Sequence, residues 1–354
     1  MEQITNSFEM LEHLMCPAFI VKNNEIIRTN FAAQQLQIST DTPLDNILAR
    51  GKTDYCAFTQ GKLCLTLATE GYSYPATVTA LEDAHLFCLE SELEKPEMKA
   101  YALAAQILRE PLSNAMLGID QLLATKDSAT AEQAAKINRN LHQILRAVSN
   151  MSDAAQYADT ENLQMQHQNI IRVLDEVFQR AASLTEQAGH TLVYDLPNCS
   201  VVCEIDSEKL ERAVLNLISN AAKYAPQNTD IKTAIRLSDT RISLTVENEL
   251  TQDSTPIGNL FSQYLRQPGI EDARAGIGLG LSIVRNVALI HGGTVLLEQP
   301  ENKVRITMSI PLENTDTTAL RSPVSLPIQY SGGYVAELVE LSDSLPYQLY
   351  DGKK

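Results

Sequence analysis

The sequence predicts a multidomain α+β protein in which a small α+β module, a helical hairpin and an α/β sandwich follow one another. Residues 1–92 alternate strand-like and short helical segments. Residues 95–158 keep an apolar period of about 3.5 residues, which is typical of packed helices. Residues 168–312 alternate amphipathic helices with strands, as an α/β sandwich does. The remaining residues, 313–354, form a Thr/Ser/Pro-bounded tail that is too apolar for a plain linker, so we expect it to dock.

Composition narrows the choice of partner and compartment. The 354 residues include 28 basic and 44 acidic side chains, a formal net charge of -16. Such a charge disfavours nucleic acid and anionic membranes as bulk partners. No apolar run approaches the roughly 20 residues that span a bilayer, and the first residues lack a signal-peptide pattern. We therefore expect a cytoplasmic protein with no membrane contact, whose six cysteines, without any CxxC pair, are small core or strand residues.

The first module is predicted to contain an antiparallel sheet. The runs AFIVKN and EIIRTN flank Asn23-Asn24, a pair that favours a tight hairpin turn. A short helix, FAAQQLQI, follows. Three further strand-like runs are KLCLTLA, SYPATVTAL and AHLFCLE.

The second region is predicted to be two helices with a break around Lys126–Thr130. Apolar residues recur at spacings of three and four on both helices: Tyr101, Ala105, Leu108, Leu112, Ala115, Ile119 and Leu122, then Ile137, Leu141, Ile144, Val148 and Met151. Two helices leave one side of this seam uncovered. A homodimer that completes a four-helix bundle is the natural solution. The alternative is an intramolecular hairpin packed on a neighbouring domain.

In the third region, a helix with two asparagines four residues apart is the first chemical signal. Asn216 and Asn220 lie on one helix face, followed by Lys223 and Tyr224. Side-chain oxygens suit magnesium, which shares its ligands with nucleotide phosphates. Alone, such a pair is more often a solvated face.

A glycine-rich run, Gly276-Ile-Gly278-Leu-Gly280-Leu281, is the second signal. Glycines let the backbone approach a phosphate, and the helix that follows offers free amides. A flexible loop capping a helix is the alternative. A dinucleotide-binding turn does not fit, because no strand leads directly into the run.

A third segment, Phe261-Ser-Gln-Tyr264-Leu-Arg266, lies between the other two, and His291-Gly-Gly follows them. In this order the segments resemble the ATP-binding domain of sensor histidine kinases and related ATPases, and the preceding helices extend the resemblance to residues 100–312. The resemblance implies ATP and Mg²⁺ as cofactors, with Asn220 holding the metal and Arg266 near the transferred phosphate. The implied cofactor-binding set is Asn216, Asn220, Lys223, Tyr224, Asn248, Arg266, Gly276, Gly278, Gly280 and Leu281.

One nucleotide-binding element departs from the family pattern. Members carry Asp-x-Gly-x-Gly after a strand, where this chain has Asn248-Glu-Leu250-Thr-Gln252. An amide oxygen can accept a hydrogen bond from adenine, but more weakly than a carboxylate. Leu250 replaces a glycine where backbone and base come close.

The phosphate-accepting site departs further. The family motif His-Glu-x-x-Thr/Asn precedes Pro-Leu, so Pro111-Leu112 places Gln106, Ile107 and Glu110 at its three chemical positions. A Gln amide has no free nitrogen lone pair for in-line attack on phosphorus. Ile107 removes the carboxylate that would act as general base. Helical phase points Gln106 to solvent. His142 on the second helix is expected to be an exposed residue, not a substitute acceptor.

The N-terminal module resembles a PAS sensory domain through Pro17-Ala-Phe-Ile-Val and Glu25-Ile-Ile-Arg-Thr-Asn30. A structural dimerisation role is the alternative. Together these resemblances predict a degenerate kinase of two-component signalling whose partner is a response regulator or another kinase subunit. An active kinase with another acceptor and a nucleotide-independent scaffold remain alternatives.

Overall fold

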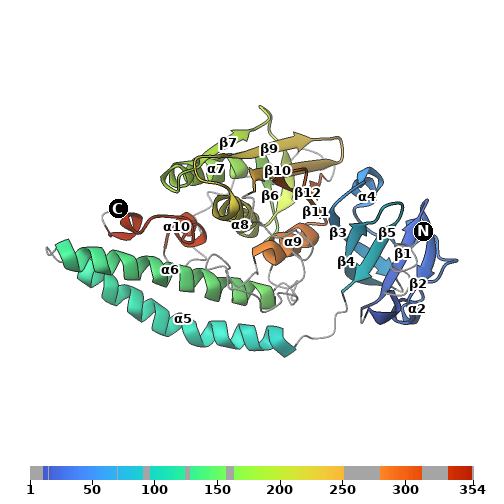
Figure 1. Ribbon diagram of the computed structural model, residues 1–354, viewed down its shortest axis with the longest axis horizontal. Helices are drawn as coiled ribbons and strands as arrows, with labels where there is room; N and C mark the ends of the chain where they lie inside the picture. Colours follow the sequence, from blue (N-terminus) through green and yellow to red (C-terminus); the bar gives the residue numbers. More distant parts are fainter. Residues whose placement is uncertain are drawn as a thin grey trace.

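The computed structural model describes residues 11–14, 16–69, 71–90, 96–123, 128–156, 163–250, 280–312 and 334–352. Figure 1 shows a β-rich N-terminal module beside a helix-covered sheet, with a long pair of helices below that sheet. The C-terminal segment returns to lie between these helices and the helices that cover the sheet. None of the helices in the described ranges has the length and apolar character needed to cross a membrane.

The N-terminal module is an antiparallel sheet with strand order β2-β1-β5-β4-β3. Its elements are β1 (Ala18–Lys22), β2 (Glu25–Thr29), α2 (Phe31–Gln35), α3 (Leu44–Ile47), α4 (Lys52–Ala57), β3 (Lys62–Thr69), β4 (Tyr72–Ala80) and β5 (His85–Leu89). The predicted hairpin is confirmed: Asn23 and Asn24 both take positive φ, the combination that a type I′ turn requires. Asn30 caps α2, and its Oδ1 also accepts from the backbone N of Ala18 at 3.0 Å.

The helical hairpin consists of α5 (Pro96–Leu123) and α6 (Ser128–Gln156), so the second helix begins within the break predicted around Lys126–Thr130. Pro111 lies inside α5 without ending it. Buried seam residues fill the space between the two helices: Ala105, Leu112, Met116, Leu145 and Val148. Other predicted seam residues are exposed, namely Leu108, Leu122, Ile137 and Ile144. One chain therefore covers only part of its own apolar seam.

The third region is a sheet covered on one face by three helices (Figure 1). Its elements are β6 (Gln166–Asn169), α7 (Ile170–Gln187), β7 (Thr191–Asp195), β8 (Val202–Ile205), α8 (Ser207–Tyr224), β9 (Asp230–Leu237), β10 (Arg241–Glu249), α9 (Gly280–Ile290), β11 (Thr294–Glu298) and β12 (Lys303–Pro311). The helix ends follow local chemistry, since Asp206 caps α8 and Gly189, at φ 87°, ends α7. The sequence analysis missed β6, which pairs with β8 apart from the main sheet.

The two sheets join edge to edge, which sequence patterns did not indicate. β3 of the N-terminal module pairs antiparallel with β11, so the order runs β2-β1-β5-β4-β3-β11-β12-β10-β9-β7 without a break. Two charged contacts reinforce the junction. The two carboxylate oxygens of Glu90, just after β5, accept hydrogen bonds from Nη1 and Nη2 of Arg285 on α9. Asp54 on α4 accepts from Arg241 Nη1 at 2.7 Å and from Ser309 Oγ at 3.0 Å.

Replacing Asp54 with Asn should loosen this junction, because Arg241 is largely buried and would lose its carboxylate partner. We expect the free energy of unfolding in urea to fall by about 1–3 kcal/mol. The matched control is Asp45→Asn, which breaks an exposed pair with Lys52 and should cost no more than about 1 kcal/mol. Equal effects of the two substitutions would contradict a stabilising role for the Asp54 contact.

Candidate functional site

Helix α8 and the start of α9 bring together three of the residues predicted to bind nucleotide. Asn216 is fully buried, and Asn220 lies one turn further along the same face. Gly280 opens α9 directly beside them: a Cβ added to it would lie 2.8 Å from Asn216 Oδ1 and 3.6 Å from Asn220 Nδ2. A larger residue there would displace the Asn216 side chain, so the close approach favours glycine. The N-terminus of α9 therefore faces the asparagine pair, as a phosphate site requires.

Only some of the other residues predicted to bind nucleotide lie within the described part of the chain. Arg266, Gly276 and Gly278 lie outside the described residues, as does Tyr264 of the aromatic segment. Lys223 lies two turns from Asn216 on α8, and its Nζ is 5.7 Å from the centre of the neighbouring Tyr224 ring. Leu281 packs into the hydrophobic core of the domain.

The departure from the family's acidic box lies at the end of β10. Asn248 is largely buried, and its Nδ2 donates to Glu249 O at 2.7 Å. Leu250 packs against the domain core, and its backbone N donates to Asn302 O at 2.7 Å. The adenine side of the predicted site is thus lined by a neutral amide beside an apolar side chain.

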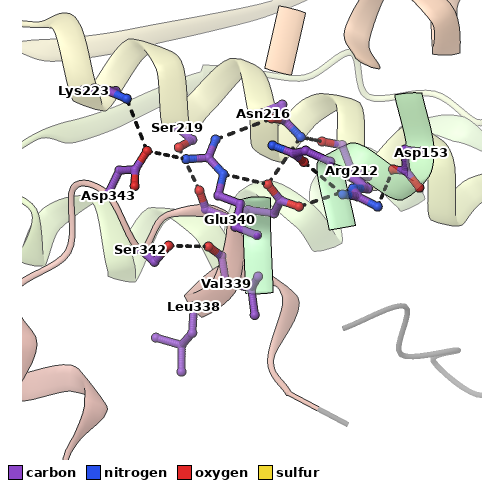
Figure 2. Close-up of polar contacts among 12 residues, drawn as sticks. Asp153, Arg212, Asn216, Ser219, Lys223, Leu338, Val339, Glu340, Ser342 and Asp343 are labelled. Atoms are coloured by element: carbon purple, nitrogen blue, oxygen red, sulfur yellow. Dashed lines mark hydrogen bonds and ion pairs between the residues drawn. The ribbon is translucent and has the colours of Figure 1, made fainter. Parts of the chain in front are cut away.

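The C-terminal tail covers the asparagine-bearing face of α8, as Figure 2 shows. It forms α10 (Ala336–Glu340) and a 3₁₀ turn, η3 (Tyr347–Tyr350). Glu340, the last residue of α10, is 0% exposed. Its Oε2 accepts from Arg146 Nε at 3.1 Å and from Asn216 Nδ2 at 3.3 Å. Its backbone O accepts from Ser219 Oγ at 2.8 Å.

A second tail carboxylate, Asp343, extends the contact along α8. Its Oδ2 lies 2.9 Å from Arg146 Nη1 and 3.3 Å from Lys223 Nζ. Arg146 also donates through Nη2 to Asn216 Oδ1 at 3.4 Å. One arginine of α6 therefore binds both tail carboxylates and the first asparagine of α8. Arg146, Glu340 and Asp343 were not predicted from the sequence, where two acids three residues apart in an apolar tail were the available signal.

A second buried arginine, Arg212, closes the network at the start of α8. It pairs with Asp153 on α6 and donates to Asn150 Oδ1 at 2.9 Å. Its Nε lies 3.3 Å from Glu340 Oε1. Burial raises the pKa of Asp153, an effect that Arg212 opposes. Each of the buried charges has an opposite charge beside it, as burial requires.

The three positions predicted as the altered acceptor site lie on the outer surface of α5. Gln106 is exposed, as expected, and so are Glu110 and Ile107, the latter at 62%. Leu108, expected in the seam, is also exposed.

The expectation that His142 is exposed is wrong. It is 4% exposed, because the tail folds over it and places the rings of Tyr334 and Tyr350 against its edge. Its Nδ1 lies 2.9 Å from Asn138 O.

His291 has a structural position, as the sequence analysis expected. Its Nδ1 donates to Val287 O at 2.7 Å, and its Nε2 accepts from the backbone N of Asp206 at 3.0 Å. The ring thus connects the end of α9 to the cap of α8 in its neutral form. Burial lowers the pKa of His291.

Comparison with known proteins places this domain in a class. Residues 205–314 match the family model described as histidine kinase-, DNA gyrase B- and HSP90-like ATPase. The match includes α8 with its asparagines and α9 with Gly280. This part of the chain is therefore an ATPase domain of that class, a type that binds ATP.

Relatives match a longer part of the chain than the ATPase family model does. The chain is 27% identical over 217 residues to the sensor histidine kinase CusS of Escherichia coli, covering 58% of this chain and 44% of that protein. It is 24% identical over 244 residues to histidine kinase P4 of Formosa agariphila, covering 64% and 18%. A solved structure, the Acinetobacter baumannii histidine kinase AdeS, aligns with a TM-score of 0.42 and 19% identity, covering 58% and 95%.

The chain is similar to sensor histidine kinases over more than half of its length, and residues 205–314 match the ATPase family that includes them. It spans less than half the length of the curated relatives described above.

Acid should destabilise the ATPase domain through His291. Because the folded-state pKa lies below the ordinary value of about 6.5, the unfolded chain binds more protons between the two values. Stability should therefore fall as the pH drops through about 6.5 towards the folded-state pKa. We expect urea unfolding to show this slope in the wild type and a flatter slope in His291→Gln. Identical slopes would contradict the assignment.

Proposed function

We propose that this protein is a degenerate sensor kinase that acts through dimerisation and partner binding, without phosphorylating its own helical hairpin. One observation carries the proposal: the exposed acceptor face of α5 holds Gln106, Ile107 and Glu110, and His142, the single histidine of residues 95–158, is buried. An in-line phosphoryl acceptor must reach the solvent-facing surface with a free lone pair. The one histidine of this helix pair does not reach that surface, and Gln106 has no free nitrogen lone pair.

Retained nucleotide binding is part of the proposal. Asn216, Asn220 and Lys223 present amide oxygens and an ammonium group beside the glycine that opens α9, which fits a magnesium-phosphate group. ATP would supply the transferable phosphoryl group. The chain's own side chains bind and orient its phosphates, while Asn248 accepts from the base with a weaker neutral oxygen.

A homodimer fits the surface of the hairpin. Several large apolar side chains of α5 and α6 are exposed: Leu103, Ile107, Leu108, Leu117, Leu122, Ile137 and Ile144. An apolar stripe of this kind is covered when two hairpins pack as a four-helix bundle. Ile107 belongs to this stripe, so the substitution that removes the general base also adds apolar surface for assembly.

The N-terminal module would supply the signal, as a PAS-like sensor in a cytoplasmic protein. Its sheet is continuous with that of the ATPase domain, which supports direct communication between the two. A response regulator or another kinase subunit of a two-component system is the proposed partner.

Labelling with radioactive ATP and Mg²⁺ tests the proposed loss of chemistry. We expect no acid-labile label on the wild type. The triple variant Gln106→His, Ile107→Glu, Glu110→Thr restores the acceptor, the general base and the third polar position, so it should gain label if nucleotide is bound productively. Adding Asn220→Ala to the triple variant should remove that label.

Acid-labile label on the wild type would contradict the degenerate-kinase proposal and favour an active kinase. Absence of nucleotide binding by calorimetry would favour the scaffold alternative.

Charges placed on the exposed stripe should separate the dimer. We expect light scattering to report a dimer for the wild type and a monomer for the double variant Leu117→Glu, Ile144→Glu, because each charge would be buried without a partner in the bundle. Val193→Glu on β7, at an equally exposed apolar position, is the matched control and should stay dimeric. A monomeric wild type would contradict the bundle.

A further inference from the structure

The tail carboxylates occupy the face of α8 that the proposed nucleotide site needs. Arg212, Asn216, Ser219 and Lys223 follow one another at spacings of three and four, so they form one stripe. Every member of this stripe contacts the tail through Glu340 or Asp343 (Figure 2).

The donors that hold these carboxylates are the ones that anionic phosphate oxygens would use. Asn216 Nδ2 donates to Glu340, and Lys223 Nζ binds Asp343. Arg146 adds charged hydrogen bonds to both acids. Carboxylate and phosphate oxygens both take charge-assisted bonds from Lys and Arg, with similar geometry. The same donors cannot serve the tail and a nucleotide together.

Buried side chains and hydrogen bonds to α6 fix the described part of the tail. The buried side chains are Val339, Leu341, Leu345 and Tyr350, and Tyr350 O accepts from Asn138 Nδ2 at 3.0 Å. Arg139 on α6 donates to the backbone oxygens of Ser342 and Asp343 at 3.1 and 3.0 Å. Anchoring on α6 therefore fixes the position at which the two acids meet α8.

We infer that residues 334–352 are an internal competitor of the nucleotide, with the carboxylates of Glu340 and Asp343 standing where phosphates would bind Asn216 and Lys223. Nucleotide and docked tail exclude each other. Because Arg146 belongs to the hairpin, the docked tail also bridges the ATPase domain and α6, in addition to the direct contacts of Arg212 with Asn150 and Asp153. The inference rests on the proposed retention of nucleotide binding.

Calorimetry on the full chain tests the competition, with a non-hydrolysable ATP analogue and Mg²⁺ as the probe. Asp343→Asn removes the ion pairs of the tail with Lys223 and Arg146. Because Asp343 is partly exposed, the protein should still fold. We expect the analogue to bind about tenfold more tightly than to the wild type. The double variant with Glu340→Gln should bind more tightly still, with thermal melting confirming that it is folded.

The charge-matched control is Glu176→Gln, which breaks a surface pair with Arg172 on α7 and should leave affinity unchanged. A second readout is hydrogen exchange of residues 334–350 in the wild type, where saturating analogue should abolish amide protection. If the analogue binds the wild type without changing the amide protection of residues 334–350, and binds Asp343→Asn with equal affinity, the inference is overturned while the proposed nucleotide binding stands. Absence of binding in every variant would overturn both.

Discussion

The fully buried carboxylate of Glu340 connects the C-terminal tail to both the helical hairpin and the ATPase domain. A charge removed from water is tolerated only with opposite charges and hydrogen bonds around it. Here Arg146 comes from the hairpin, Arg212 and Asn216 from the ATPase domain, and the acid itself from the tail. Removing Glu340 would leave Arg146 with Asp343 and Arg212 with Asp153 as their remaining carboxylate partners, so the buried charges would be less well compensated. The position of the tail, the burial of His142 and the orientation of α6 on α8 all follow from this arrangement.

The edge-to-edge sheet gives the N-terminal module a second route to the ATPase domain. If the two domains were joined only by the helical hairpin, a change in the N-terminal module would reach the ATPase domain through α5 and α6. Here β3 pairs with β11, and Arg285, on the helix that begins with Gly280, pairs with Glu90 of the N-terminal module. A shift in the N-terminal sheet would thus act directly on α9, whose first residue faces Asn216.

The hairpin has kept its packing while its exposed chemistry has changed. Ala105, Leu112 and Val148 fill the seam, and Pro111 is accommodated within α5. The altered positions, Gln106, Ile107 and Glu110, are all on the surface, where substitution costs little stability. The residues at these three positions can therefore differ from the family pattern without disturbing the packing of the two helices.

The sequence alone predicted most of the helices and strands, and the resemblance to sensor histidine kinases. The Asn-Asn turn, the period of the hairpin, the cap at Asp206 and the asparagine pair of α8 are local patterns, in which neighbours along the chain set the conformation. It also located the missing acceptor, because Pro111 fixes the register of α5.

Only the tertiary structure decided which surfaces meet. Pairing of β3 with β11 joins residues more than 200 positions apart, and either strand edge satisfies its own hydrophobic pattern without the other. The exposure expected for His142 was wrong for the same reason: the tail that buries it arrives from the far end of the chain. Nothing in the sequence distinguishes Glu340 and Asp343 from other acidic residues. Their partner Arg146 is distant along the chain and comes within ion-pair distance only on folding.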